Sequence, residues 1–84
     1  MLTIKYFTAS WCGPCKMFSP VFDKVMMETG VNYQKIDVDS NKDLALKYGV
    51  MSVPTLIFER DGVVVNRRTG VCSHNELATM VNRS

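Results

Sequence analysis

Two cysteines separated by two residues, Cys12 and Cys15, form the pattern in this chain that predicts chemistry. They follow the apolar run at residues 2–7 and open a stretch with helical periodicity. At a helix start, unpaired backbone N–H groups and the positive end of the helix dipole stabilise a thiolate on the first sulfur. The second sulfur, one turn along, can attack a mixed disulfide formed on the first. The spacing therefore predicts a redox dithiol, with Cys12 as nucleophile and Cys15 as resolving thiol.

The two residues between the cysteines suit a helix start beside a reactive sulfur. Gly13 carries no Cβ, which leaves access next to the nucleophile. Pro14 fixes φ within the first helical turn, where a missing N–H costs little. We therefore include both residues in the predicted catalytic motif.

The elements that position this motif follow from periodicity and turn signals. We expect strands at residues 2–7, 31–38, 55–60 and 63–67, a helix from Cys12 to a left-handed stop at Gly30, and later helices over residues 41–48 and after Ser73. Ser40 is the expected cap of the short helix, Asp61-Gly62 suits a two-residue type I′ turn, and Ser73 with Glu76 has capping-box spacing. Methionines at helical positions, among them Met17 and Met27, are expected to fill the core.

The predicted order β-α-β-α-β-β-α indicates an α/β fold. Because a helix separates the first two strands, they should be parallel, and the last two should form an antiparallel hairpin. We therefore expect a four-stranded mixed sheet flanked by three helices, formed by one domain over residues 1–84.

Composition limits the class of protein and of partner. The 84 residues are 46% hydrophobic and 21% charged with a net charge of +2, which is typical of a globular protein and argues against disorder. The chain has no basic patch for nucleic acid, no apolar run long enough for a membrane helix and no export signal. Three cysteines in such a chain favour a reducing compartment, and we expect a cytoplasmic location.

Several motifs together resemble the thioredoxin family. Residues 11–16, Trp-Cys-Gly-Pro-Cys-Lys, are similar to its active site, and residues 52–55, Ser-Val-Pro-Thr, about forty residues later, resemble its cis-proline loop. Pro20, residues 35–39, residues 48–50 and Gly70 also match at similar spacing, so the resemblance covers nearly the whole chain. It implies a minimal thioredoxin-like fold without the usual N-terminal strand and helix, and with the second strand beside the first, then the third and fourth.

The resemblance also implies a function. Thioredoxins reduce protein disulfides through a reversible dithiol/disulfide cycle, here Cys12-Cys15, and bind no cofactor or metal. The family's electron donor is an NADPH-dependent thioredoxin reductase, and its substrates include ribonucleotide reductase. The resemblance also implies that the chain is a monomer. Trp11, Val53, Pro54 and Gly70 match its substrate-binding surface.

The chain departs from the family at two positions near the site. Thioredoxins usually place a buried Asp six residues before the first cysteine, where this chain has Tyr6, and a Trp four residues before it, where this chain has Thr8. That Asp accepts the proton of the second thiol in the family, so the departure affects rate and potential. Lys35 matches the position that pairs with the Asp and is a candidate to act on the thiols, the alternative being a strand lysine that reaches solvent.

Two alternatives stay open from sequence. A glutaredoxin-like, glutathione-coupled enzyme is favoured by the short chain and by residues 70–73, Gly-Val-Cys-Ser, which loosely resemble a glutathione loop. The second alternative is a non-catalytic subunit that docks another protein through Trp11 and the Val53-Pro54 loop. Cys72 is expected to be a small buried residue, and zinc binding by the three cysteines and His74 is disfavoured by their spacing.

Overall fold

A computed structural model describes all 84 residues, and its elements follow the predicted order. The strands are β1 (Leu2–Thr8), β2 (Asn32–Asp37), β3 (Thr55–Arg60) and β4 (Val63–Thr69), and the helices are α1 (Gly13–Thr29), α2 (Lys42–Lys47) and α3 (His74–Arg83). No helix combines the length and the apolar content that crossing a bilayer requires.

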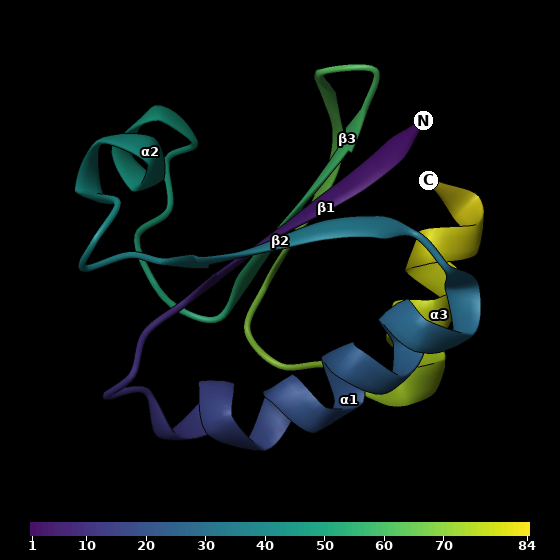
Figure 1. Ribbon diagram of the computed structural model, residues 1–84, viewed down its shortest axis with the longest axis horizontal. Coiled ribbons are helices and arrows are strands. Elements are labelled where there is room, and N and C mark those ends of the chain that lie inside the picture. The colour runs from purple at the N-terminus through teal and green to yellow at the C-terminus, as the bar shows by residue number, and fades with distance from the viewer.

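The four strands form one mixed sheet in the order β2-β1-β3-β4, which confirms the expected topology. The pair β1 and β2 is parallel, whereas β3 runs antiparallel to both β1 and β4. Figure 1 shows α1 and α3 on one side of this sheet and α2 on the other. Since β1 lies in the middle of the sheet, its carboxyl end holds the following loop, with Cys12, at a fixed point.

Helix α1 begins and ends as its sequence predicts. Cys12 is the N-cap with extended backbone, Pro14 lies in the first turn, and Gly30 ends the helix in the left-handed region with φ 67°. The helix continues through Pro20. Its buried face consists of Cys15, Phe18, Phe22, Val25 and Met26. This face holds the start of the helix, and with it both cysteines, against β1.

The predicted cap of α2 was wrong. The N-cap is Asn41, not Ser40, and no side chain caps the helix. Ser40 lies in the turn after β2, where its backbone N–H donates to the Asp37 carbonyl, and the Asn41 amide donates to the same carbonyl at 2.9 Å. Short polar side chains compete for nearby backbone groups in this way, and here the Asn41 side chain bonds the turn while no side-chain oxygen accepts an N–H of the first turn of α2.

The predicted hairpin and the last helix are confirmed. Asp61 and Gly62 join β3 to β4 with φ values of 54° and 84°, the positive angles of a type I′ turn. Helix α3 begins with a complete capping box, in which Ser73 accepts from the Glu76 backbone and the Glu76 side chain accepts from the Ser73 backbone.

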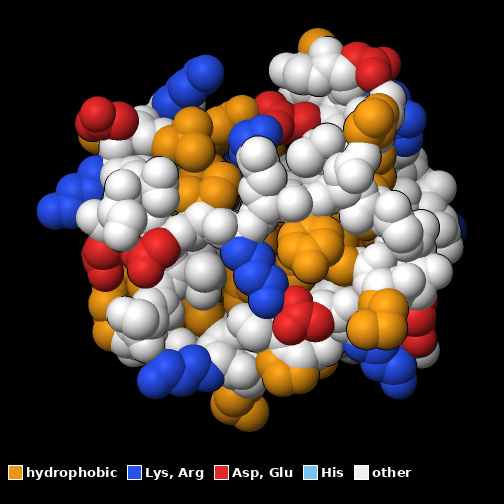
Figure 2. All heavy atoms as spheres, in the orientation of Figure 1, with side chains coloured by type: hydrophobic (Ala, Val, Ile, Leu, Met, Phe, Trp, Pro, Cys, Tyr) orange, Lys and Arg blue, Asp and Glu red, His pale blue; other side chains and the backbone are white.

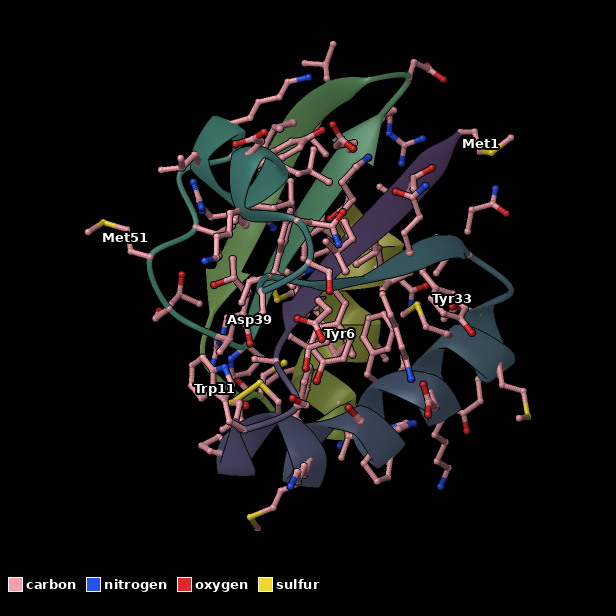
Figure 3. The ribbon with its side chains drawn as sticks, turned by 60° about the vertical axis from the view of Figure 1, so that its left-hand side comes forward. Met1, Tyr6, Trp11, Tyr33, Asp39 and Met51 are labelled. Atoms are coloured by element: carbon pink, nitrogen blue, oxygen red, sulfur yellow. A yellow bond between two sulfur atoms is a disulfide. The ribbon has the colours of Figure 1, made fainter.

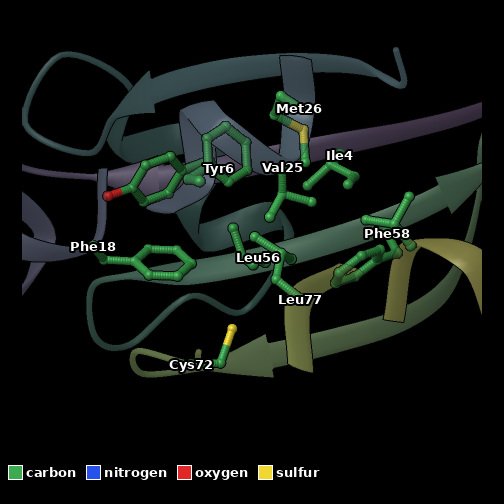
Figure 4. Packing of buried hydrophobic residues seen from close by; sticks show 11 residues of the cluster. Ile4, Tyr6, Phe18, Val25, Met26, Leu56, Phe58, Cys72 and Leu77 are labelled. Carbon is green, nitrogen blue, oxygen red and sulfur yellow. The ribbon is translucent and has the colours of Figure 1, made fainter. Parts of the chain in front are cut away.

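Two apolar clusters lie on the two faces of the sheet. The larger, of 11 buried residues, joins β1 and β3 to α1 and α3, and includes Tyr6, Phe18, Phe22 and Leu77 (Figure 4). The smaller consists of Phe7, Ile36, Ala45 and Ile57 on the α2 side. The prediction that helical methionines fill the core was wrong for Met17 and Met27, which are 80% and 84% exposed because they lie on the outer face of α1. Acidic and basic side chains are interspersed across the face shown in Figure 2.

Candidate active site

The two cysteines of the motif are joined in a disulfide at the start of α1. Their Cα atoms are 5.2 Å apart, and the sulfur–sulfur bond lies close to Trp11 in Figure 3. Both residues are nearly buried, with 4% exposure for Cys12 and 1% for Cys15. The structure therefore places the predicted pair at bonding distance, with Cys12 as the more accessible of the two.

One backbone N–H at the helix start points at the Cys12 sulfur. The Cys15 N–H donates to Cys12 Sγ at 3.2 Å, so the sulfur occupies the position of an N-cap acceptor. The Cys12 N–H in turn donates to the Ala9 carbonyl at 3.2 Å, which fixes the loop before the helix. When the disulfide is reduced, an N–H aimed at Cys12 Sγ favours its thiolate over its thiol.

The loop before β3 brings distant residues to the disulfide. The Val53-Pro54 peptide bond is cis, and the Val53 carbonyl oxygen lies 3.7 Å from Cys12 Sγ. No hydrogen bond of the structure uses the Val53 N–H. The Gly70 N–H donates to the Pro54 carbonyl at 2.8 Å, which joins the end of β4 to the same loop. The structure thus brings together Cys12, Val53, Pro54 and Gly70.

Trp11 lies at the rim of this site. Its side chain is 66% exposed, and its indole Nε1 donates to Asp39 Oδ2 at 2.8 Å (Figure 3). Beside it, Trp11, Val53, Met51 and their neighbours line a mainly apolar hollow of about 130 Å³. No local pattern in the sequence marks Asp39 for this pairing, because the contact joins residues 28 positions apart.

Tyr6 fills the space under the first turn of α1. Its side chain is fully buried, and its hydroxyl donates to the Cys15 carbonyl at 3.1 Å and lies 3.0 Å from Ser19 Oγ. The one buried carboxylate of the chain, Glu59, belongs to the opposite face of the sheet, where it contacts Lys5 and Tyr48. A neutral hydroxyl therefore stands where the family resemblance implied a carboxylate.

Lys35 has a partner other than the thiols. Its ammonium lies 2.6 Å from Asp23 on α1, and both side chains are well exposed. Its suggested action on the cysteines stays a prediction, and the ion pair supports the alternative of a strand lysine that reaches solvent.

Cys72 is the one free cysteine and is buried, as expected. Burial raises the pKa of its thiol, the Arg68 charge lowers it by a smaller amount, and the Glu76 charge raises it slightly further. It lies at a mainly apolar groove of about 290 Å³ that Pro14, Met17 and Val71 also line. His74 contacts Glu28 at 2.6 Å, and the structure brings no three His, Cys, Asp or Glu side chains together in a metal-binding group.

Comparison with protein families gives a match over nearly the whole chain. The model of the thioredoxin family matches residues 2–83. A thioredoxin of Bacillus subtilis is 47% identical over 79 residues, which cover 92% of this chain and 76% of that protein. A thioredoxin of Mycoplasmoides gallisepticum is 37% identical over 76 residues, covering 89% of this chain and 76% of the relative.

Solved structures of thioredoxins superpose closely. A thioredoxin-2 described as a component of the malaria parasite protein secretion machinery gives a TM-score of 0.95 at 31% identity, covering all of this chain and 84% of the other. A mutant thioredoxin from Halobacterium salinarum gives 0.93 at 38% identity, covering 98% of this chain and 73% of the other. The likeness therefore extends to every element described above.

Proposed function

This chain belongs to the thioredoxin family and is a protein thiol–disulfide oxidoreductase whose redox group is its own Cys12–Cys15 pair, and from that premise we propose how its residues divide the reaction. Cys12 is the nucleophile and Cys15 the resolving thiol. The observation that carries this assignment is the Cys15 N–H aimed at Cys12 Sγ. Gly13 leaves open space beside the nucleophile, since a Cβ there would meet no atom within 4 Å.

The proposed cycle transfers two electrons to the substrate. The Cys12 thiolate attacks one sulfur of a substrate disulfide, whose S–S bond breaks as the Cys12–substrate bond forms, and the released substrate thiolate takes a proton. Cys15 then loses its proton and attacks Cys12 Sγ. The mixed disulfide breaks, the second substrate thiolate takes a proton, and the Cys12–Cys15 disulfide forms. The substrate gains two electrons and two protons.

We propose that an extended segment of the substrate protein binds across the Val53-Pro54 loop. The free Val53 N–H and its carbonyl near Cys12 Sγ give the pair of backbone groups that an added strand needs. Trp11, held by Asp39, and Gly70, bonded to Pro54, form the two sides of this surface. The site therefore recognises backbone first, which suits an enzyme that acts on many protein disulfides.

The direct test uses the two active-site cysteines and insulin disulfides as substrate, with dithiothreitol as electron donor. Cys12→Ser should abolish reduction, because it removes the nucleophile, and burial raises the pKa of the one free cysteine, Cys72. Cys15→Ser should accumulate mixed disulfides on Cys12, located by mass spectrometry after digestion, because the resolving thiol is gone. Cys72→Ser is the matched control and should retain full activity. Mixed disulfides on Cys72 would overturn the assignment.

The electron donor, the oligomeric state and the cellular location are the remaining parts of the proposed function. We propose that an NADPH-dependent thioredoxin reductase recharges the disulfide, that ribonucleotide reductase is among the substrates, and that the chain works as a monomeric single domain in the cytoplasm. Family membership supports a reductase as donor. Turnover assays with thioredoxin reductase and NADPH, against glutathione with glutathione reductase, separate this donor from the glutathione-coupled alternative. Faster turnover with glutathione would contradict the proposal.

A further inference from the structure

Two hydroxyl groups connect the first turn of α1 to β1, directly beneath the disulfide. The Tyr6 hydroxyl must donate to the Cys15 carbonyl, because a carbonyl can only accept. A phenol has one hydrogen, so the contact at 3.0 Å to Ser19 Oγ is a bond in which Ser19 donates to Tyr6. The result is a short chain from Ser19 through Tyr6 to the main chain of Cys15.

The packing of the Tyr6 ring fixes the position of its hydroxyl. Its ring is fully buried on the central strand β1, with an edge-on contact to Phe18 at 5.6 Å and a tilted contact to Phe22 at 4.6 Å between ring centroids. In Figure 4 the hydroxyl points away from the remainder of this cluster. A rigid donor from the sheet therefore meets the carbonyl of one of the two reacting residues.

We propose that Tyr6, supported by Ser19, is a positioning residue for Cys15, which it acts on through the Cys15 carbonyl and not by contact with the sulfur. This inference rests on the proposed role of Cys15 as resolving thiol. The hydrogen bond restrains the first turn of α1 after reduction, when the disulfide no longer does so. It keeps Cys15 Sγ within reach of Cys12 Sγ and so raises the effective concentration of the resolving thiol.

An effective concentration of this kind is measurable as a reduction potential. At equilibrium with a buffer disulfide, the two protein thiols become the Cys12–Cys15 disulfide while the buffer disulfide becomes two thiols. Loss of the restraint lets the reduced form spread over more conformations, which disfavours ring closure. The potential then rises, and a tenfold loss of effective concentration corresponds to about 30 mV for a two-electron couple.

A purely structural role for the same bond gives a different result. If Tyr6 stabilises the oxidised and reduced forms equally, its removal lowers the stability of both by the same amount and leaves the potential unchanged, because the four states form a closed thermodynamic cycle. The potential therefore separates positioning from general stabilisation, which an activity assay alone does not.

The experiment compares Tyr6→Phe, Ser19→Ala and the double variant with the unchanged chain, with Trp11 fluorescence reporting equilibration in thiol/disulfide buffers. Tyr6→Phe keeps the ring packing and should lower the effective concentration about three- to tenfold, the size expected for one hydrogen bond. Ser19→Ala should have a smaller effect, and none when Tyr6 is already Phe, because it acts through the Tyr6 hydroxyl.

Tyr48→Phe is the matched control. Its hydroxyl also makes a hydrogen bond, a partly buried one of 2.6 Å to Glu59, but on the opposite face of the sheet, so its loss should leave the potential unchanged. A potential for Tyr6→Phe within error of the unchanged chain overturns the inference, as does an equal shift for Tyr48→Phe. If Cys15→Ser still traps mixed disulfides in that case, the proposed function stands and the positioning role alone fails.

Discussion

The tyrosines on the two faces of the sheet have different surroundings, since Tyr6 is fully buried and Tyr48 is half-buried. On the α1 side, Tyr6 bonds neutral groups and lies within the larger apolar cluster. On the α2 side, Tyr48 bonds the Glu59 carboxylate, which also binds the Lys5 ammonium. The face that carries the dithiol is held by aromatic packing and uncharged hydrogen bonds, whereas the other face carries the buried charge. Titration of the Glu59–Lys5 pair on the α2 face should therefore leave the redox site undisturbed.

The ion pair between Glu59 and Lys5 on the α2 face stabilises the folded state. Burial alone would raise the pKa of Glu59, but hydrogen bonds from Lys5 and Tyr48 outweigh it and hold the pKa below its usual value. Burial would likewise lower the pKa of Lys5, yet its bond and attraction to Glu59 raise it. Since both partners keep their charged forms more firmly in the folded state, the ion pair stabilises the fold.

The largest expected loss of stability comes from removing a buried phenylalanine, and one from each face of the sheet is compared. Phe22→Ala should lower the free energy of unfolding by about 4–5 kcal/mol, because Phe22 is fully buried among the 11 residues of the larger cluster. Phe7→Ala, in the cluster of 4, should cost about 3 kcal/mol. Urea unfolding followed by circular dichroism measures both losses. Equal losses would contradict the view that the α1 face provides most of the apolar stabilisation.

Removing the buried charge should have the next largest effect. Glu59→Gln should cost about 2 kcal/mol, less than for a fully buried pair because Lys5 keeps 17% side-chain exposure. Asp23→Asn, which breaks the exposed pair with Lys35, is the matched control and should cost at most about 1 kcal/mol. The same urea titrations apply. A loss no greater than that of the control would show that the α2 face does not depend on its ion pair.

Acid should weaken the α2 face selectively. Because the folded pKa of Glu59 lies below the usual 4.5, its stabilisation is present above that value and is lost as pH falls through the folded pKa. The stability of the unchanged chain should therefore fall more steeply below pH 4.5 than that of Glu59→Gln. Unfolding free energies measured from neutral pH into the acid range test this, and parallel curves would exclude Glu59 as the source.

The smallest expected change in stability comes from His74, which contacts Glu28 at the surface on the α1 side of the sheet. The hydrogen bond to Glu28 raises the pKa of His74, helped by Asn75 and opposed by slight desolvation and by Lys24. Its stabilisation is complete below the usual pKa of 6.5 and disappears as pH rises through the raised folded pKa. The chain should thus be slightly more stable than His74→Gln at about pH 6 and equally stable at about pH 9. A constant difference would exclude titration of His74.

Local signals predicted most of the elements, because they depend on neighbours in the chain. Gly30 ended α1, Asp61-Gly62 formed the hairpin turn, and Ser73 with Glu76 capped α3, each through contacts within a few residues. The prediction that Ser40 caps α2 was wrong because Ser40 and Asn41 are adjacent polar residues that can both begin a helix. Local rules do not decide which of the two takes that position.

The sequence by itself determined the redox pair and the α/β order, since helix-start chemistry and strand periodicity depend on neighbouring residues. The loop that faces Cys12 followed from the family resemblance of residues 52–55, because its contact with Cys12 joins residues 41 positions apart. Only the tertiary structure decided the partners of buried and charged groups. The bond of Tyr6 to Cys15, the pairing of Lys35 with Asp23 and that of Trp11 with Asp39 join separate elements. Such pairings depend on how helices pack on the sheet, which fixes distances that no local pattern contains.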